Sequence, residues 1–197
     1  VTMTVNLGRT YTPGEPFTVK VTYSGVPTSG GFGSINFRTR GGAREVWTLS
    51  ETDWAHTWFP CKENNLDKSV ADMPFTVPNT MKVVSNGVLQ SVTPASGSRL
   101  TYFWRTLLPT ATYLYCFSAT NHNEYTQTWN FTPHSGPAVS MPVTIWLYPE
   151  SDTLTNRNAW FRCIDMLSAF SPADRFGLYP FASEKYGMYQ FGFGGGM

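Results

Sequence analysis

Short runs in which apolar and polar residues alternate follow one another along most of the chain, and this pattern restricts the fold more than any other feature. Because successive side chains of a β-strand point to opposite faces, a period of two predicts strands that bury one face. Residues Gly41-Gly42 and Asn86-Gly87 separate neighbouring runs and predict tight turns. We therefore expect an antiparallel sandwich or bent multi-sheet domain. The alternating runs are 17–23, 35–39, 46–48, 75–77, 82–84, 88–92, 100–104, 113–117, 125–131 and 143–147.

The composition provides a core and excludes several classes of partner. Hydrophobic residues make up 41% of the 197 residues and aromatic residues 16%, which is enough for a sizeable core. Charged residues are only 14%, and 14 Lys and Arg nearly balance 13 Asp and Glu. The sequence therefore shows no basic patch of the kind that binds nucleic acid. No apolar run approaches the ~18 residues of a membrane span. The low charge and the high content of Thr, Tyr and Trp favour an exported protein, and the sequence does not decide the compartment.

The pattern changes after Pro149. Thr155 or Asn156 can cap the start of a helix, and Pro172 should end it, so we expect one helix near 156–171. An aromatic strand near 186–193 follows. One helix and one strand cannot enclose a core, so we interpret residues 150–197 as the truncated start of a second domain after a β domain at 1–149. The apolar residues at helical spacing are Trp160, Cys163, Ile164, Leu167 and Phe170.

The cysteines, histidines and isolated acidic residues show no metal-binding pattern. We expect free thiols that pack as small hydrophobic side chains, although a disulfide stays open if the protein is exported. The histidines lack the Glu-x-x-His spacing of zinc peptidases, so we expect structural or surface roles for them. Asp165 and Glu184 are interpreted as a helix charge and a loop charge. The cysteines and histidines are Cys61, Cys116, Cys163, His56, His122 and His134.

Several stretches, in this order along the chain, resemble the membrane alanyl aminopeptidase family of zinc metallopeptidases, the gluzincin aminopeptidases that include the leukotriene hydrolase type. One stretch is Trp58-Phe59-Pro60-Cys61-Lys62-Glu63-Asn64-Asn65-Leu66-Asp67-Lys68, preceded by Ser50-Glu51-Thr52-Asp53-Trp54-Ala55-His56. The others are Val84-Ser85-Asn86-Gly87, Thr112-Tyr113-Leu114, Thr144-Ile145-Trp146-Leu147-Tyr148-Pro149, Tyr179-Pro180-Phe181, Glu184-Lys185-Tyr186 and Gly194-Gly195-Gly196-Met197. Asn64 stands where the family often has aspartate, and Asn65-Leu66 replaces a proline-containing turn.

The resemblance implies a mainly β protein: an antiparallel β saddle domain at 1–149, followed by one helix and one strand of an incomplete thermolysin-like domain at 150–197. In the family, that domain continues through Gly-x-Met-Glu-Asn into the zinc motif His-Glu-x-x-His. The motif's glutamate and all zinc ligands would lie beyond Met197. We therefore expect no catalytic and no metal-binding residue in this chain, zinc only in the full-length parent, and no activity of the fragment alone.

The resemblance also implies substrate-binding residues. Gly194, Gly195, Gly196 and Met197 match the start of the exopeptidase motif, and glycine lets two backbones approach closely, as binding an extended peptide requires. Glu51, by its offset from Phe59-Pro60-Cys61, would bind the cationic free α-amine of a substrate. The alternatives are a loose tail for the glycines and a solvated strand-end charge for Glu51.

The expected function is that of an N-terminal fragment of a zinc-dependent aminopeptidase, which contributes the pocket for the substrate N-terminus. Its partners would be the remaining catalytic domain and a peptide substrate, and the unpaired edge of the terminal strand could mediate self-association. One alternative is a carbohydrate-binding module that stacks sugars on Trp47, Trp54 or Trp129. Another is a naturally truncated, non-catalytic homologue that acts as an interaction domain.

Overall fold

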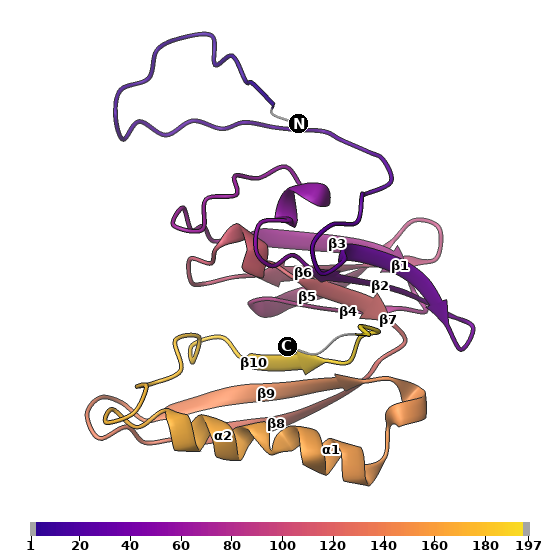
Figure 1. Cartoon of the computed structure of the whole chain (residues 1–197), viewed down its shortest axis with the longest axis vertical. Coiled ribbons are helices and arrows are strands. Elements are labelled where there is room, and N and C mark those ends of the chain that lie inside the picture. The colour runs from indigo at the N-terminus through magenta and orange to yellow at the C-terminus, as the bar shows by residue number, and fades with distance from the viewer. Residues whose placement is uncertain (1–2, 195–197) are drawn as a thin grey trace.

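Three sheets form the body of the protein. The structure, a computed structural model, describes residues 3–194 (Figure 1). Two antiparallel sheets have the strand orders β1-β2-β7-β4 and β3-β6-β5, and a mixed sheet has the order β10-β9-β8. The strands are β1 Ser34–Arg40, β2 Ala43–Leu49, β3 Asp72–Pro78, β4 Lys82–Ser85, β5 Val88–Ala95, β6 Arg99–Arg105, β7 Phe117–Thr120, β8 Asn123–Phe131, β9 Val139–Leu147 and β10 Tyr186–Tyr189. The predicted mainly β fold is confirmed.

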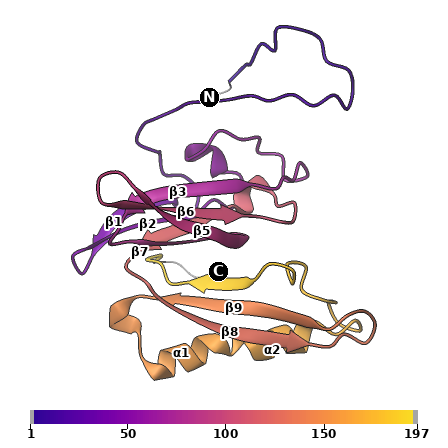
Figure 2. The same cartoon turned by 180° about the vertical axis from the view of Figure 1, so that it is seen from behind.

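Two lobes can be distinguished. The first, here the β lobe, contains β1–β7, with the short 3₁₀ helices η1 (Ala55–Thr57) and η2 (Thr112–Leu114). The second, here the helix lobe, contains β8–β10, the 3₁₀ helix η3 (Pro149–Ser151), and the helices α1 (Leu154–Phe161) and α2 (Cys163–Phe170). The helices run along the β8–β9 side of their sheet, while β10 lies at the edge that faces the β lobe (Figure 1, Figure 2).

Local turn chemistry sets the β lobe. Gly41 and Gly42, at φ 54° and 83°, form the two-residue turn of the β1–β2 hairpin, where both central residues need positive φ. Gly87, at φ 75°, joins β4 to β5, and a Cβ there would lie 2.1 Å from the carbonyl oxygen of Arg105. The predicted tight turn at Gly41-Gly42 is therefore confirmed, while Asn86-Gly87 forms a bend between two strands that belong to different sheets. The two sheets of this lobe enclose a core of Ile35, Val46, Met81, Val83, Tyr102, Trp104, Phe117 and Ala119.

The helix lobe has a separate core, formed where α2 covers β8 and β9. Trp129 is 0% exposed and donates a hydrogen bond from Nε1 to Ser168 Oγ at 2.9 Å. The three cysteines are free, and Cys163 is buried in this core. Strands before Pro149 and a helix after it share one core, although the domain boundary at 149/150 stays a prediction. The buried members of the core are Trp129, Met141, Val143, Cys163 and Leu167.

The predicted helix is present and begins earlier than expected. Its N-cap is Thr153, whose side chain accepts a hydrogen bond from the Asn156 backbone N–H at 3.1 Å, and not Thr155 or Asn156. The α-helical bonding pattern is interrupted at Arg162, which separates α1 from α2. The second helix ends at Phe170, two residues before Pro172, as predicted. Among residues 3–194, no helix is both long and apolar enough to cross a membrane.

Two predicted strands are wrong. Residues 17–23 alternate in sequence but form no strand, because no segment within residues 3–194 pairs with them; Phe17 is 54% exposed and Tyr23 59%. Figure 1 shows this N-terminal part as a long loop that stands away from the sheets. Residues 113–117 largely form η2 and the connection to β7, which begins only at Phe117.

Truncating the buried face of α2 tests its packing. Leu167→Ala removes a side chain that is 8% exposed and should lower the free energy of unfolding by about 2–5 kcal/mol. Met166→Ala, at a neighbouring position that is 57% exposed, should change it by no more than about 0.5 kcal/mol. Urea unfolding of both variants gives the comparison. Equal losses would contradict the burial of α2 on the sheet.

Candidate functional site

The chain crosses from the helix lobe to the β lobe immediately after β10. This strand pairs in parallel with β9 from Tyr186↔Val143 to Tyr189↔Trp146, and the Gln190 backbone N–H donates to Trp146 O at 2.9 Å. From there the chain runs along the β lobe. Residues 189–193 are called the anchored segment below.

Side chains of the β lobe and its connection to β8 hold the backbone of the anchored segment. Arg38 Nη1 donates to Gly192 O at 3.1 Å, and His122 Nε2 contacts Gln190 O at 2.8 Å. Because a carbonyl oxygen only accepts, Nε2 of His122 carries the proton. In return, the Tyr189 hydroxyl donates to Thr48 O, in β2, at 3.1 Å. The segment therefore follows a path set by the β lobe.

Aromatic packing reinforces these hydrogen bonds. The Trp47 ring lies 4.8 Å from the Phe191 ring and 6.4 Å from the Phe193 ring, measured between centroids. Phe32 meets Phe193 edge to face at 6.1 Å. The predicted strand near 186–193 is therefore shorter than expected. It ends at Tyr189, because beyond Gln190 the backbone finds side-chain partners in place of a neighbouring strand.

The glycines after β10 differ in their surroundings. A Cβ at Gly192 would lie 1.7 Å from Arg38 Cζ, so the guanidinium occupies the space that any side chain would need. Gly194 is exposed and has nothing within 4 Å of the position where a Cβ would lie. The predicted site residues Gly195, Gly196 and Met197 lie outside the described residues.

Glu51 lies in the turn that follows β2 and is half-buried. The structure records no hydrogen bond or ion pair of its carboxylate with another of residues 3–194, and none that joins it to Gly194. The two predicted site residues are nevertheless linked through β2. That strand carries Trp47, which packs on Phe193, and ends just before Glu51.

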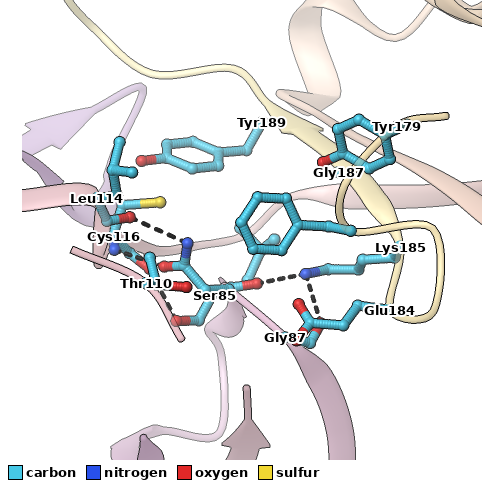
Figure 3. A pocket seen from close by; sticks show the side chains of 13 residues that line it. Ser85, Gly87, Thr110, Leu114, Cys116, Tyr179, Glu184, Lys185, Gly187 and Tyr189 are labelled. Carbon is cyan, nitrogen blue, oxygen red and sulfur yellow. Dashed lines mark hydrogen bonds between the residues drawn. The ribbon is translucent and has the colours of Figure 1, made fainter. Parts of the chain in front are cut away.

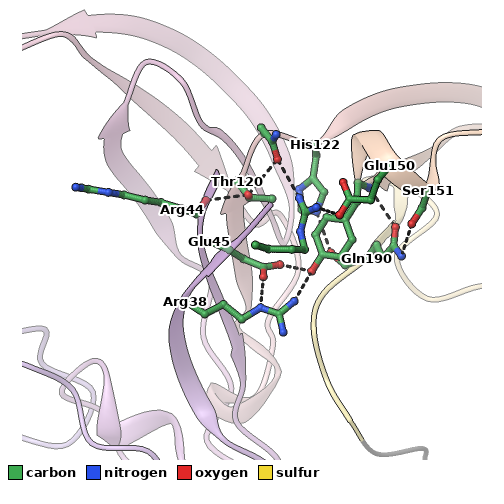
Figure 4. A network of polar contacts seen from close by, with 11 residues as sticks. Arg38, Arg44, Glu45, Thr120, His122, Glu150, Ser151 and Gln190 are labelled. Carbon is green, nitrogen blue, oxygen red and sulfur yellow. Dashed lines mark hydrogen bonds and ion pairs between the residues drawn. The ribbon is translucent and has the colours of Figure 1, made fainter. Parts of the chain in front are cut away.

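A buried acid lies behind the anchored segment (Figure 4). The Glu45 side chain is 0% exposed and accepts hydrogen bonds from Arg38 Nε and from the Tyr148 hydroxyl. Arg38 Nη2 donates to the Tyr148 oxygen at 3.2 Å, which closes a triangle of three side chains. Burial, with the Glu45 hydrogen bond, raises the pKa of Tyr148 to about 12. Arg40 stacks over the Tyr148 ring at 3.5 Å and pairs with Glu150.

His122 is buried beside this triangle. Its ring stacks on Tyr148 with 5.4 Å between centroids and 11° between planes. Burial lowers its pKa from 6.5 to about 4, and Nδ1 has no partner among the described residues. The neutral imidazole thus holds Gln190 O through its one N–H. The predicted structural role for His122 agrees with this geometry.

Lys185 closes a pocket of about 200 Å³ between the lobes (Figure 3). Its Nζ donates to Ser85 O and to Gly87 O, both at 2.7 Å, and lies 4.8 Å from the Trp104 ring centroid. Burial lowers the pKa of Lys185 to about 8. This lysine attaches the loop before β10 to the β4–β5 turn.

Glu184 lies in the loop before β10, as the sequence suggested, but its side chain is buried and bonded to the backbone of another loop. It is 7% exposed, and its Oε1 accepts the backbone N–H groups of Leu107 at 2.6 Å and of Leu108 at 3.0 Å. Sequence reasoning also missed the roles of Arg38, Glu45 and Lys185 at this interface. The only signal was the position of Glu184-Lys185 beside an aromatic strand, since charges next to buried strands need partners.

Comparison with known proteins identifies the family. The profile of the Peptidase M1 N-terminal domain matches residues 1–114. The chain belongs to the M1 peptidase family. The resemblance found in the sequence is thereby confirmed. No curated protein matches the chain significantly.

Solved structures of M1 peptidases share the fold. The M1 zinc metallopeptidase from Deinococcus radiodurans has a TM-score of 0.62 and 20% identity over 84% of this chain. A variant of it bound to Tyr-ser-ala substrate gives 0.61 and 19% over 84%. A two-domain M1 zinc metallopeptidase variant bound to L-tryptophan gives 0.61 and 22% over 84%. In each case the chain spans 36% of the matched protein.

The buried His122 should make stability depend on pH. Its pKa is lowered from 6.5 to about 4, so the unfolded chain binds a proton at higher pH than the folded chain. The contribution of the neutral His122 side chain to the free energy of unfolding is complete above pH ~6.5. It is lost as the pH falls toward ~4, and the total loss is roughly 3 kcal/mol. His122→Asn should flatten this part of the stability profile, measured by urea unfolding. His134→Asn, at an exposed position, should not. Parallel profiles for His122→Asn and the wild type would contradict the assignment.

Proposed function

We propose that this chain forms the N-terminal part of a zinc-dependent aminopeptidase. Residues 1–149 would be its β saddle domain, and residues 150–197 the start of its thermolysin-like catalytic domain. The observation that carries the proposal is the anchored segment. The backbone that leads into the proposed exopeptidase motif is held on the β lobe by Arg38, His122 and Trp47, so the two lobes would together form one wall of the substrate cleft. The membership in the M1 family supports the same reading.

The chain's contribution to the reaction would be to bind the substrate. Gly194, Gly195, Gly196 and Met197 would line the extended peptide, because glycine backbone groups can approach another backbone closely. Glu51 would accept hydrogen bonds from the substrate's α-amine, which is cationic below pH ~8. The half-buried Glu51 carboxylate, with no recorded partner among residues 3–194, is consistent with this role.

Zinc would be held by residues outside the described part of the chain. Within residues 3–194, no group of three or more His, Cys, Asp or Glu side chains could hold a metal ion. His122 donates to a backbone carbonyl and His56 Nδ1 contacts Glu63 at 2.8 Å, and neither ring belongs to a group of that size. When bound in the parent, zinc would supply an activated water for hydrolysis. The residues described here would orient the peptide.

The rival carbohydrate-binding function loses its main support. Trp47 and Trp129 are 3% and 0% exposed, so two of the three proposed sugar platforms are inside the protein. The third, Trp54, is half-buried and is covered by the backbone of Gly30 and Gly31. Aromatic richness here serves packing.

Removing the Glu51 carboxylate tests the proposed substrate pocket. A hydrogen bond to a charged group is worth ~1.5–3 kcal/mol, so Glu51→Ala should lower kcat/KM about tenfold or more on substrates with a free amine. The measurement uses the longer peptidase that contains this chain. Asp165→Asn, an exposed helix position with 72% side-chain exposure, is the matched control. Unchanged kinetics in Glu51→Ala would reject the role.

Purified residues 1–197 should neither hold stoichiometric zinc nor hydrolyse aminoacyl anilides. A catalytic site needs about three protein ligands, and residues 3–194 contain no group of three or more His, Cys, Asp or Glu side chains that could hold a metal ion. Metal analysis after dialysis against zinc, together with an anilide assay, checks this. Chelator-sensitive hydrolysis by the chain alone would place the reaction centre within these residues and overturn the proposal.

A further inference from the structure

We propose that Arg38 is a positioning residue, which acts through the Gly192 carbonyl to fix Phe193 and Gly194, the described start of the proposed substrate-binding glycine run. This inference rests on the proposed function, since it concerns the edge that would hold the peptide. It assigns a role to a β-lobe residue that lies far from the glycines in sequence and makes no contact with substrate itself.

The geometry of the guanidinium supports this role. One planar group makes three contacts: Nε with Glu45, Nη2 with Tyr148 Oη at 3.2 Å, and Nη1 with Gly192 O at 3.1 Å. Arginine presents its donors in a rigid fork, so two filled contacts determine where the third donor points. The position of Gly192 O is therefore set by the two contacts behind it.

Arg38 has little freedom to leave this position. Glu45 is its ion-pair partner and has a side chain that is 0% exposed. Moving the guanidinium away would leave the buried Glu45 carboxylate without its ion-pair partner, which is strongly destabilising. The Glu45 hydrogen bond also raises the pKa of Arg38, so the guanidinium stays charged. The Arg38 side chain is itself 37% exposed, so the constraint comes from its bonds to the buried Glu45 carboxylate and to Tyr148.

Fixing Gly192 O also fixes the start of the glycine run. The peptide unit is planar, so the Gly192 carbonyl and the Phe193 N–H share one orientation. That N–H donates to Phe191 O at 3.1 Å, and the rings of Phe191 and Phe193 pack on Trp47. Gly194 follows directly and is exposed. Without such an anchor a run of glycines samples many conformations, and its ordering would have to be supplied by substrate binding.

The contact between Arg38 and Gly192 also depends on the lack of a side chain at Gly192. A Cβ would lie 1.7 Å from Arg38 Cζ, so only glycine lets the guanidinium lie against this peptide. Arg38 and Gly192 are therefore a matched pair, and a change in either should release the same segment. This gives two independent ways to disturb the anchor.

The anchoring is tested on the chain itself by the hydrogen exchange of individual backbone amides, followed by NMR. Arg38→Gln and Gly192→Ala should each speed exchange of the Phe193 amide about tenfold or more, while the amides of β9 keep their protection. Arg38→Lys, which keeps the charge beside Glu45 but lacks the fork, should also speed it. Arg105→Gln is the control, because Arg105 pairs with Asp72 on the exposed side of the β3–β6 pair. Unchanged Phe193 exchange in Gly192→Ala would overturn the proposal, even if Arg38→Gln unfolds the chain.

The consequence for substrate is tested in the longer peptidase. Arg38→Gln should raise KM about tenfold for free-amine peptide substrates and leave the zinc content unchanged, and Arg105→Gln should do neither. If Glu51→Ala impairs catalysis but Arg38→Gln does not, the positioning role is wrong and the proposed function stands. If neither variant changes the kinetics, the proposed function itself fails. A loss of zinc in Arg38→Gln would show a general structural effect and would also overturn the positioning role.

Discussion

The buried Glu45 carboxylate is the charge around which the two lobes meet. With a side chain that is 0% exposed, it requires partners, because an isolated charge in such surroundings would be strongly destabilising. Arg38 comes from the same hairpin, and Tyr148 comes from the end of β9. Satisfying one carboxylate therefore fixes the helix lobe against the β lobe. The same guanidinium reaches Gly192, so the path of the anchored segment follows from the burial of Glu45.

A second set of contacts holds the other end of the interface. Lys185 donates to carbonyls of the β4–β5 connection, and Glu184 accepts N–H groups from the loop after β6. Lys185 and Glu184 fix the start of β10, and Arg38 fixes the segment after its end. All three are charged side chains bonded to backbone groups. Such bonds are stronger than neutral ones and have defined geometry. The edge proposed to hold a peptide backbone would therefore be supported on both sides.

The sequence predicts what depends on local pattern. Alternation located most strands, Gly41-Gly42 the hairpin, and Pro172 the end of the helix, because strand faces, positive φ and proline geometry are properties of short segments. The alternation at 17–23 indicates a strand with one apolar face, but it does not indicate which strand would pair with it. No pairing strand is present in residues 3–194. The partners of Glu45, Glu184 and His122 escaped prediction because they lie up to 103 residues away along the chain. Glu51 and the glycine run came from family resemblance, and the structure adds that Gly194 has open space where a Cβ would lie.

The central claim is that the anchored segment lies on β2, and nuclear Overhauser contacts between aromatic rings test it most directly. In this chain, the Trp47 indole protons should show cross-peaks to the rings of Phe191 and Phe193, whose centroids lie 4.8 Å and 6.4 Å away. These cross-peaks should persist at neutral pH alongside those within the β-lobe core. A spectrum that keeps the core contacts of Trp104 and Phe117 but lacks those of Trp47 with Phe191 and Phe193 would contradict the account.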